Sequence, residues 1–245
     1  MRRAIVMTLG LIGLALAHPA AADEPLVADL SKDSIEITTG FTGTDVLLFG
    51  ATDGDGDVVV LVRGPDMEMV VRKKRRTAGI WINREGVTFA NVPSFYRLAT
   101  SGPLSETVSE AVAESYPVGV EYLDLKTISG EPADHSFRTA LLRLLRTEKL
   151  YDRQIGGIQF LGSGLFRVEL FFPTNVPTGT YMVDVLLLRD GALVASTRYP
   201  LAVRKIGVGA EAFRFAHDRP AAYGAIAILI ALLTGWLAGL LFRKH

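Results

Sequence analysis

The stretch GTYMVDVLLLRDGALVASTRYPLAV (Gly179–Val203) decides the fold of this 245-residue chain. It holds two strand-like apolar runs, Thr180–Leu188 and Leu193–Val203, which are separated by the turn residues Arg189-Asp-Gly191. The sequence Pro177-Thr-Gly-Thr-Tyr181, which leads into the first run, is typical of a late strand in an immunoglobulin-like sandwich. We therefore predict a mainly β protein built as an immunoglobulin-like β-sandwich.

Earlier parts of the chain supply the remaining strands of this predicted sandwich. Alternating or continuous apolar runs predict strands at Ser34–Thr38, Val46–Phe49, Val58–Val62, Gly79–Asn83, Val87–Asn91 and Leu165–Phe172. The Asp-Gly pairs in Thr52–Asp57 favour positive φ and predict a hairpin between the two strands that flank them. The early and late strands would then form a single sandwich, with two separate domains as the alternative.

A helical insertion interrupts the strands at about residues 101–153. Apolar residues of Pro103–Tyr116 recur at helical spacing, so we predict one amphipathic helix there. A second helix begins after Asp134, a good N-cap residue, and its apolar positions follow the i, i+3, i+4, i+7 pattern from Phe137 to Leu145. Both helices are expected to pack on the sheet.

The N-terminus has the three parts of a secretory signal peptide. Arg2 and Arg3 precede the 14-residue apolar run Ala4–Ala17, and Ala20-Ala21-Ala22 offers a cleavage site. We predict a signal peptide at residues 1–22, since a membrane-spanning helix needs about 20 apolar residues. An uncleaved anchor is the alternative.

The C-terminus carries a predicted transmembrane helix at residues 221–242. Ala221–Phe242 runs 22 residues without a charge, which suffices to cross a bilayer. The signal peptide would export the body at residues 23–205, followed by a juxtamembrane linker at 206–220 and a cytosolic tail at 243–245. We therefore expect a single-pass protein of the inner membrane whose body lies in the periplasm, with the lipid bilayer as one partner.

Composition excludes several classes of function. The chain has no cysteine, so a disulfide framework, a thiolate nucleophile and an iron–sulfur site are ruled out. Its 26 basic and 26 acidic residues give no reason to expect a nucleic-acid partner. Beyond the predicted signal peptide the histidines are His135, His217 and His245, and no nucleophile or phosphate-binding motif is present. We predict a protein that is not an enzyme, with no cofactor and no catalytic residue.

Two charged clusters are candidate contact sites in the exported body. Asp53, Asp55 and Asp57 offer oxygen ligands for calcium, but the EF-hand spacing is missing and an ordinary turn is the favoured interpretation, so no metal is predicted. The run Arg72, Lys73, Lys74, Arg75, Arg76 could contact anionic lipid or an acidic partner. The alternative for this run is a solvated strand end that discourages aggregation.

The predicted transmembrane helix carries a candidate packing face. Gly235 and Gly239 form a G-x-x-x-G motif, and Ala231 and Gly224 extend the line of small residues. Small residues let two helix backbones approach closely. A partner helix from another inner-membrane protein is therefore expected at this face.

Several stretches resemble the alphaproteobacterial transmembrane protein family, whose members have a signal peptide, a periplasmic domain and one C-terminal membrane span. The stretches are Ala28-Asp-Leu-Ser31, Phe41-Thr-Gly43, Leu48-Phe-Gly50, Val62-Arg-Gly-Pro65, Gly79-Ile-Trp-Ile-Asn83 and Val92-Pro-Ser-Phe-Tyr96. The resemblance implies no catalytic residues, and it implies a place beside sulfite or other sulfur-anion exporters. The function we expect is that of an accessory or interaction protein of an inner-membrane complex, such as a transporter. A periplasmic module that binds or senses a small ligand or metal is the alternative.

Overall fold

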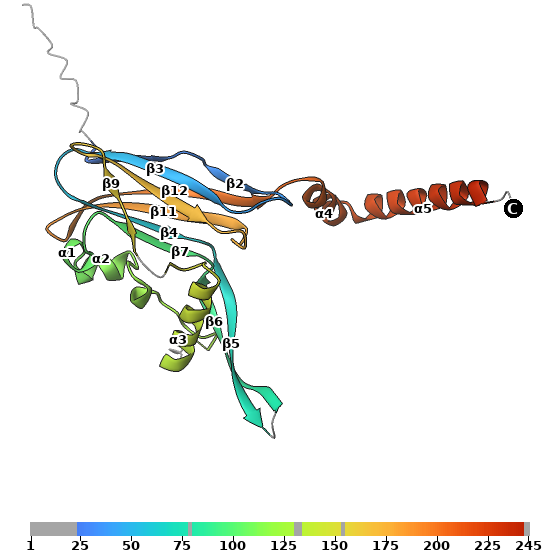
Figure 1. Cartoon of the computed structure of the whole chain (residues 1–245), viewed down its shortest axis with the longest axis horizontal. Helices are drawn as coiled ribbons and strands as arrows, with labels where there is room; N and C mark the ends of the chain where they lie inside the picture. The colour runs from blue at the N-terminus through green and yellow to red at the C-terminus, as the bar shows by residue number, and fades with distance from the viewer. Residues whose placement is uncertain (1–23, 78–79, 130–133, 153–154, 243–245) are drawn as a thin grey trace, which may run out of the picture.

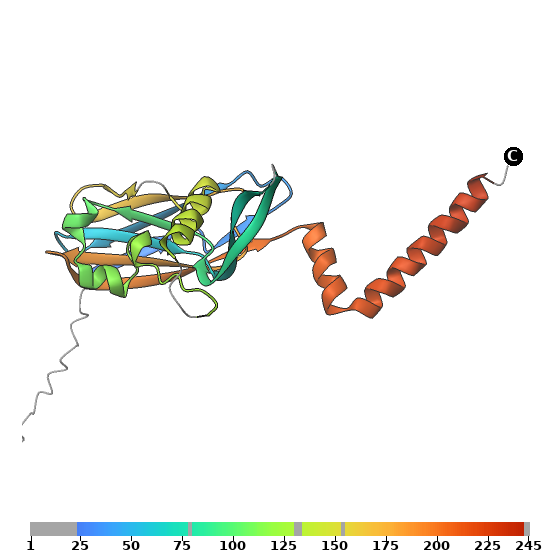
Figure 2. The same cartoon turned by 90° about the horizontal axis from the view of Figure 1, so that it is seen from below.

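The computed structural model describes residues 24–77, 80–129, 134–152 and 155–242. Two sheets pack against each other to form the body of the protein, and a long C-terminal helix leaves the body at one end (Figure 1, Figure 2). The predicted signal peptide at 1–22 and the predicted tail at 243–245 lie outside the described residues.

The strands fall into two sheets and one separate ribbon. The four-stranded sheet has the order β1 (Leu26–Leu30), β3 (Thr44–Thr52), β10 (Leu165–Phe172), β9 (Gln159–Phe160). The six-stranded sheet has the order β2 (Ser34–Ile37), β12 (Ala192–Lys205), β11 (Gly179–Arg189), β4 (Asp57–Arg63), β7 (Tyr96–Thr100), β8 (Gly156–Gly157). The ribbon consists of β5 (Asp66–Thr77) and β6 (Ile80–Pro93). Strands from both ends of the chain therefore share one sheet.

The helices lie outside the two sheets. They are α1 (Leu104–Thr107), α2 (Glu110–Ser115), the 3-10 turn η1 (Val120–Tyr122), α3 (His135–Thr147), α4 (Val208–Asp218) and α5 (Pro220–Phe242). Helix α4 occupies most of the predicted juxtamembrane linker. The prediction of a mainly β protein with one C-terminal apolar helix is thus confirmed, whereas the immunoglobulin-like topology stays a prediction.

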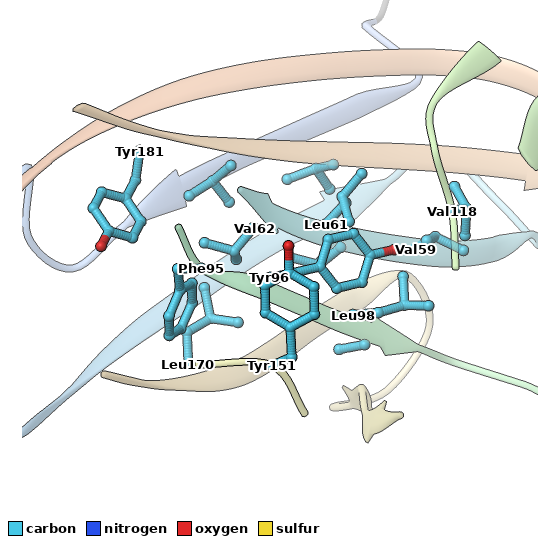
Figure 3. Packing of buried hydrophobic residues seen from close by; sticks show 14 of the residues in the cluster. Val59, Leu61, Val62, Phe95, Tyr96, Leu98, Val118, Tyr151, Leu170 and Tyr181 are labelled. Carbon is cyan, nitrogen blue, oxygen red and sulfur yellow. The ribbon is translucent and has the colours of Figure 1, made fainter. Parts of the chain in front are cut away.

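One apolar core joins the two sheets and α3. β4 is buried on both faces from Val58 to Val62, as its continuous apolar run requires, and β10 alternates buried and exposed residues. Phe172 of β10 stacks on Phe95 at 5.0 Å between ring centroids and meets Tyr181 of β11 edge-on at 5.9 Å. Figure 3 shows side chains of this core, including Phe95 between β6 and β7, Leu170 of β10 and Tyr181 of β11.

Three local predictions were wrong. β3 and β4 belong to different sheets, so Thr52–Asp57 carries the chain from one sheet to the other and is no hairpin. The Asp-Gly pairs mark a reversal of the chain but do not select the strand's partner. β4 pairs with β11 and β7 instead, which satisfies the backbone hydrogen bonds along both of its edges.

The first insertion helix is also divided. Val108 is extended, at φ −123° and ψ 122°, and Ser109 starts a new helix after it. The backbone N–H of Ser109 donates to the carbonyl of Gly191 at 3.2 Å, which ties the break to the β11–β12 turn. Of the two short strands predicted at Gly79–Asn83 and Val87–Asn91, the described residues 80–83 and 87–91 belong to one strand, β6, and Gly79 lies outside the described residues.

The β11–β12 hairpin and α3 follow the sequence closely. Asp190 and Gly191 have φ of 52° and 74°, the positive values that a tight hairpin turn needs. Helix α3 begins after Asp134 as predicted, and it buries Phe137, Leu141 and Leu145. The Asp134 carboxylate accepts a hydrogen bond from the Ser136 hydroxyl rather than from a backbone N–H of the helix.

Candidate functional site

A cleft with several cations lies where β7, β10 and the end of α3 meet. We call it the Arg97 cleft; it is a cavity of 440 Å³ lined by Arg97, Arg146, Thr147, Lys149, Tyr151, Asp152 and Phe171. A neighbouring cavity of 220 Å³ shares Arg97 and Asp152 and runs along β10 past Arg167 and Glu169.

The end of α3 turns sharply and brings the chain alongside β7. Lys149 has a φ of 59°, and the N–H of Leu150 donates to the Leu145 carbonyl at 3.0 Å, a common way to end a helix. The chain then forms a bridge between Tyr151 and Tyr96 of β7. This pairing places Asp152 beside Arg97.

Two tyrosine hydroxyls near the Arg97 cleft form hydrogen bonds with backbone groups of neighbouring segments. The Tyr151 hydroxyl donates to the Pro93 carbonyl at 2.8 Å, and the Tyr96 hydroxyl donates to the Pro117 carbonyl at 3.0 Å. The Tyr96 oxygen also accepts from the N–H of Gly119 at 2.6 Å. Burial raises the pKa of both hydroxyls well above their ordinary value, so both are neutral at physiological pH.

Arg97 is largely withdrawn from water. Its side chain is 16% exposed, its Nη1 lies 3.1 Å from the Asp152 carboxylate, and its guanidinium lies within 6 Å of the rings of Phe95 and Phe171. Its Nε is buried and has no hydrogen-bond partner in the described part of the chain. Desolvation lowers the pKa of Arg97, while Asp152 and Asp45 oppose that shift. Burial in turn raises the pKa of Asp152, against the effect of Arg97.

The charge in the cleft is unbalanced. Its cations are Arg97, Arg146 and Lys149, and its one acidic lining residue is Asp152. Arg146 also has a buried Nε without a partner among the described residues. Sequence reasoning missed this site, because its residues come from three separate segments. The available signal was Arg97, a lone charge in an otherwise uncharged strand.

The Asp53-Gly-Asp-Gly-Asp57 cluster is divided among other partners. The Asp53 carboxylate forms an ion pair with Arg189, whose Nε donates to the Asp55 carbonyl at 2.8 Å. The Asp57 carboxylate accepts from the Ser101 hydroxyl at 2.7 Å. Within the described ranges, no group of three His, Cys, Asp or Glu side chains could hold a metal ion.

The basic run lies on β5, in the part of the ribbon that extends from the body. We call the ribbon of β5 and β6 the arm. The register places Arg72 opposite Gly86, Lys74 opposite Asn83 and Arg76 opposite Trp81. Figure 1 shows the arm extending past α3 in a direction different from that of α5.

Of this run, Lys73 is held against α3. Its Nζ lies 3.6 Å from the Asp134 carboxylate and 4.2 Å from the centre of the Phe137 ring. Arg72 is exposed to solvent. The side chains of Lys74, Arg75 and Arg76 lie outside the described set.

The predicted packing face of α5 meets no other part of the described chain. A Cβ added at Gly235 or Gly239, or at Gly224 further up the helix, would find no heavy atom within 4 Å. The helix spans 23 residues with a mean hydropathy of 2.4 and has none of that segment buried. The small-residue face is therefore free to meet another helix.

A mainly β body joined to one C-terminal helix that is long and apolar enough to cross a bilayer defines the class: a candidate single-span membrane protein. The chain belongs to the family described as "Putative transmembrane protein (Alph_Pro_TM)", whose model matches residues 25–244. The family resemblance in the sequence is thereby confirmed. A comparison with curated proteins gives no match.

Proposed function

We propose that this protein is a membrane-anchored accessory protein of an inner-membrane complex, with its body in the periplasm and its C-terminus in the cytoplasm. The observation that carries the proposal is the arm. Its strands of 12 and 14 residues belong to neither sheet of the body. At about 3.3 Å per residue, such a ribbon reaches roughly 40 Å from its base.

The charge of the arm indicates the kind of surface that it meets. Residues 72–85 contain six basic residues and one acidic residue, whereas residues 23–219 as a whole contain 22 basic and 26 acidic residues. The arm is therefore a positive extension of an otherwise acidic body. We propose that it docks on an acidic periplasmic surface of the partner, because opposite surface charges steer association and fix its register.

The second contact is within the membrane. Gly235 and Gly239 leave a flat strip on α5 that no described part of this chain covers. A helix of the partner would pack there through close backbone approach. A transporter is the partner class that we propose, specifically an anion or sulfite exporter, and the support for that class is the family resemblance alone.

Photo-crosslinking in intact cells tests the arm. A photoreactive amino acid at position 74 should crosslink to an inner-membrane protein, and the crosslink should weaken when Arg75 and Arg76 become Gln. The matched control places the same amino acid at position 126, since Lys126 is exposed on the body. Equal crosslinks from both positions, or adducts with this protein alone, would contradict docking through the arm.

Affinity capture in mild detergent tests the helix face. Gly235→Leu and Gly239→Leu add bulk to the small-residue face and should reduce recovery of the same partner. Ala222→Leu adds similar bulk about 140° around the helix from Gly235 and about 100° from Gly239, so it should leave recovery unchanged. Undiminished capture by the two Gly variants would refute packing at this face. A reporter fused after His245 that is active outside the cytoplasm would refute the proposed orientation.

A further inference from the structure

We infer that the Arg97 cleft binds a small oxyanion, such as a carboxylate, sulfate or phosphate group, between the guanidinium groups of Arg97 and Arg146 and the ammonium group of Lys149. This site lies on the body, apart from the arm and α5. The inference therefore stands independently of the proposed docking function.

The side chains that line the Arg97 cleft carry more positive than negative charge. Three cations line one cavity and Asp152 is its one acidic lining residue, which leaves an excess of two positive charges. The side chains of Arg146 and Lys149 make no hydrogen bond or ion pair with any described residue. Arg97 and Arg146 are partly buried, and such cations are costly unless an anion or a hydrogen-bond acceptor compensates them, whereas Lys149 is exposed.

The side chains of Arg97 and Arg146 are partly enclosed by the protein. The Nε atoms of Arg97 and Arg146 are both buried, so the stems of these side chains are enclosed. The groups that remain to face the cavity are the terminal nitrogens. Guanidinium groups bind the oxygens of carboxylates, sulfates and phosphates through paired hydrogen bonds. Because β7 and α3 both pack into the core, the two groups are positioned before a ligand arrives.

The guanidinium group of Arg97 is already oriented by its neighbours. Arg97 lies near two aromatic rings, at 5.4 Å from Phe95 and 5.7 Å from Phe171, and it touches Asp152 on one side. The Asp152 carboxylate pairs with one terminal nitrogen of the Arg97 guanidinium, so it competes with an incoming anion. A ligand oxygen would therefore reach the free terminal nitrogen of Arg97 and the unpaired groups of Arg146 and Lys149.

The test is calorimetric titration of the full-length protein in detergent with sodium sulfate, sodium phosphate and sodium acetate, at constant ionic strength maintained with chloride. Arg146→Gln and Lys149→Gln should each weaken binding by about tenfold, the usual effect of losing one charged hydrogen bond. The matched control is Arg143→Gln, which removes the same charge from an exposed position of α3 outside the cavity.

A second pair of variants keeps the inference testable if Arg146→Gln or Lys149→Gln fails to fold. Asp152→Asn removes the competing carboxylate and should tighten anion binding severalfold. Glu148→Gln removes an exposed neighbouring charge and should leave binding unchanged. Binding of sulfate and phosphate but not acetate identifies a tetrahedral ligand, and comparable acetate binding identifies a carboxylate. The inference is overturned if none of the three anions binds at millimolar concentration, or if Arg143→Gln weakens binding as much as Arg146→Gln.

Discussion

Replacement of Phe172 by Ala should be among the most damaging single changes in the body. Its ring is fully buried between the sheets, where it stacks on Phe95 and meets Tyr181 edge-on. Loss of a buried Phe side chain costs about 3–5 kcal/mol, since the neighbours only partly fill the cavity. For a body of this size, 1 kcal/mol corresponds to about 2–4 °C, so we expect a fall in melting temperature of roughly 6–20 °C.

The neighbouring residue supplies the control. Phe171 is 39% exposed and points to the opposite face of β10, so Phe171→Ala should cost less than about 1.5 kcal/mol, mainly through its contact with Arg97. Melting of the full-length protein in detergent, followed by near-ultraviolet circular dichroism of the buried aromatic rings, measures both variants. A loss for Phe171→Ala equal to that for Phe172→Ala would refute the register of β10, because a one-residue slip exchanges the two faces of a strand.

Three further predictions address other parts of the body. Gly64→Ala should destabilise it by about 1–3 kcal/mol in urea unfolding, because the new Cβ would lie 2.4 Å from the Ser94 hydroxyl, whereas Gly40→Ala has open space and should be nearly neutral. Calcium at millimolar concentration should leave the melting temperature unchanged, because Asp53 is paired with Arg189; a clear rise would revive the metal site. Burial raises the pKa of Tyr96, Tyr151 and Tyr181. Their contribution to the free energy of unfolding is therefore complete below pH 10, and it should be lost as the pH rises further, because the unfolded chain ionises first. The part of the tyrosinate absorbance at 295 nm that belongs to these three of the seven tyrosines should therefore appear together with unfolding, and its appearance while the protein is still folded would contradict this.

The strands could be predicted where burial is periodic. β10 alternates along its whole length, and β11 and β12 flank a turn that requires positive φ, so their positions follow from local chemistry. Strand partners could not be predicted in the same way. β3 and β4 are neighbours in sequence but lie in different sheets, because pairing depends on which apolar faces meet across the core. The break at Val108 depends on a hydrogen bond to a distant turn, which no local pattern encodes.

The Arg97 cleft was hidden for a related reason. Arg97 and Arg146 are 49 positions apart in the sequence, and the turn after α3 brings them to one cavity. The basic run and the Asp-Gly cluster drew attention because their charges are contiguous. Contiguous charges are usually solvated together, whereas a desolvated site is assembled from single charges placed in apolar surroundings. Isolated charges within apolar strands are therefore the better sequence signal for such a site.

The length of the arm has no explanation in the stability of the body. Its base is well fixed, since Phe89 and Val92 are fully buried and Lys73 contacts α3. β6 also pairs there with a neighbouring segment, through the N–H of Ala90 to the Lys126 carbonyl at 3.0 Å. Beyond that base, toward Thr77, the two strands pair only with each other in the described chain. An isolated two-stranded ribbon is at best marginally stable in water, so the outer part adds little to folding. The partner contact that we propose would account for its length and its positive charge. Shortening the arm by paired deletions beyond position 74 should then abolish the crosslink from that position while leaving the melting temperature nearly unchanged.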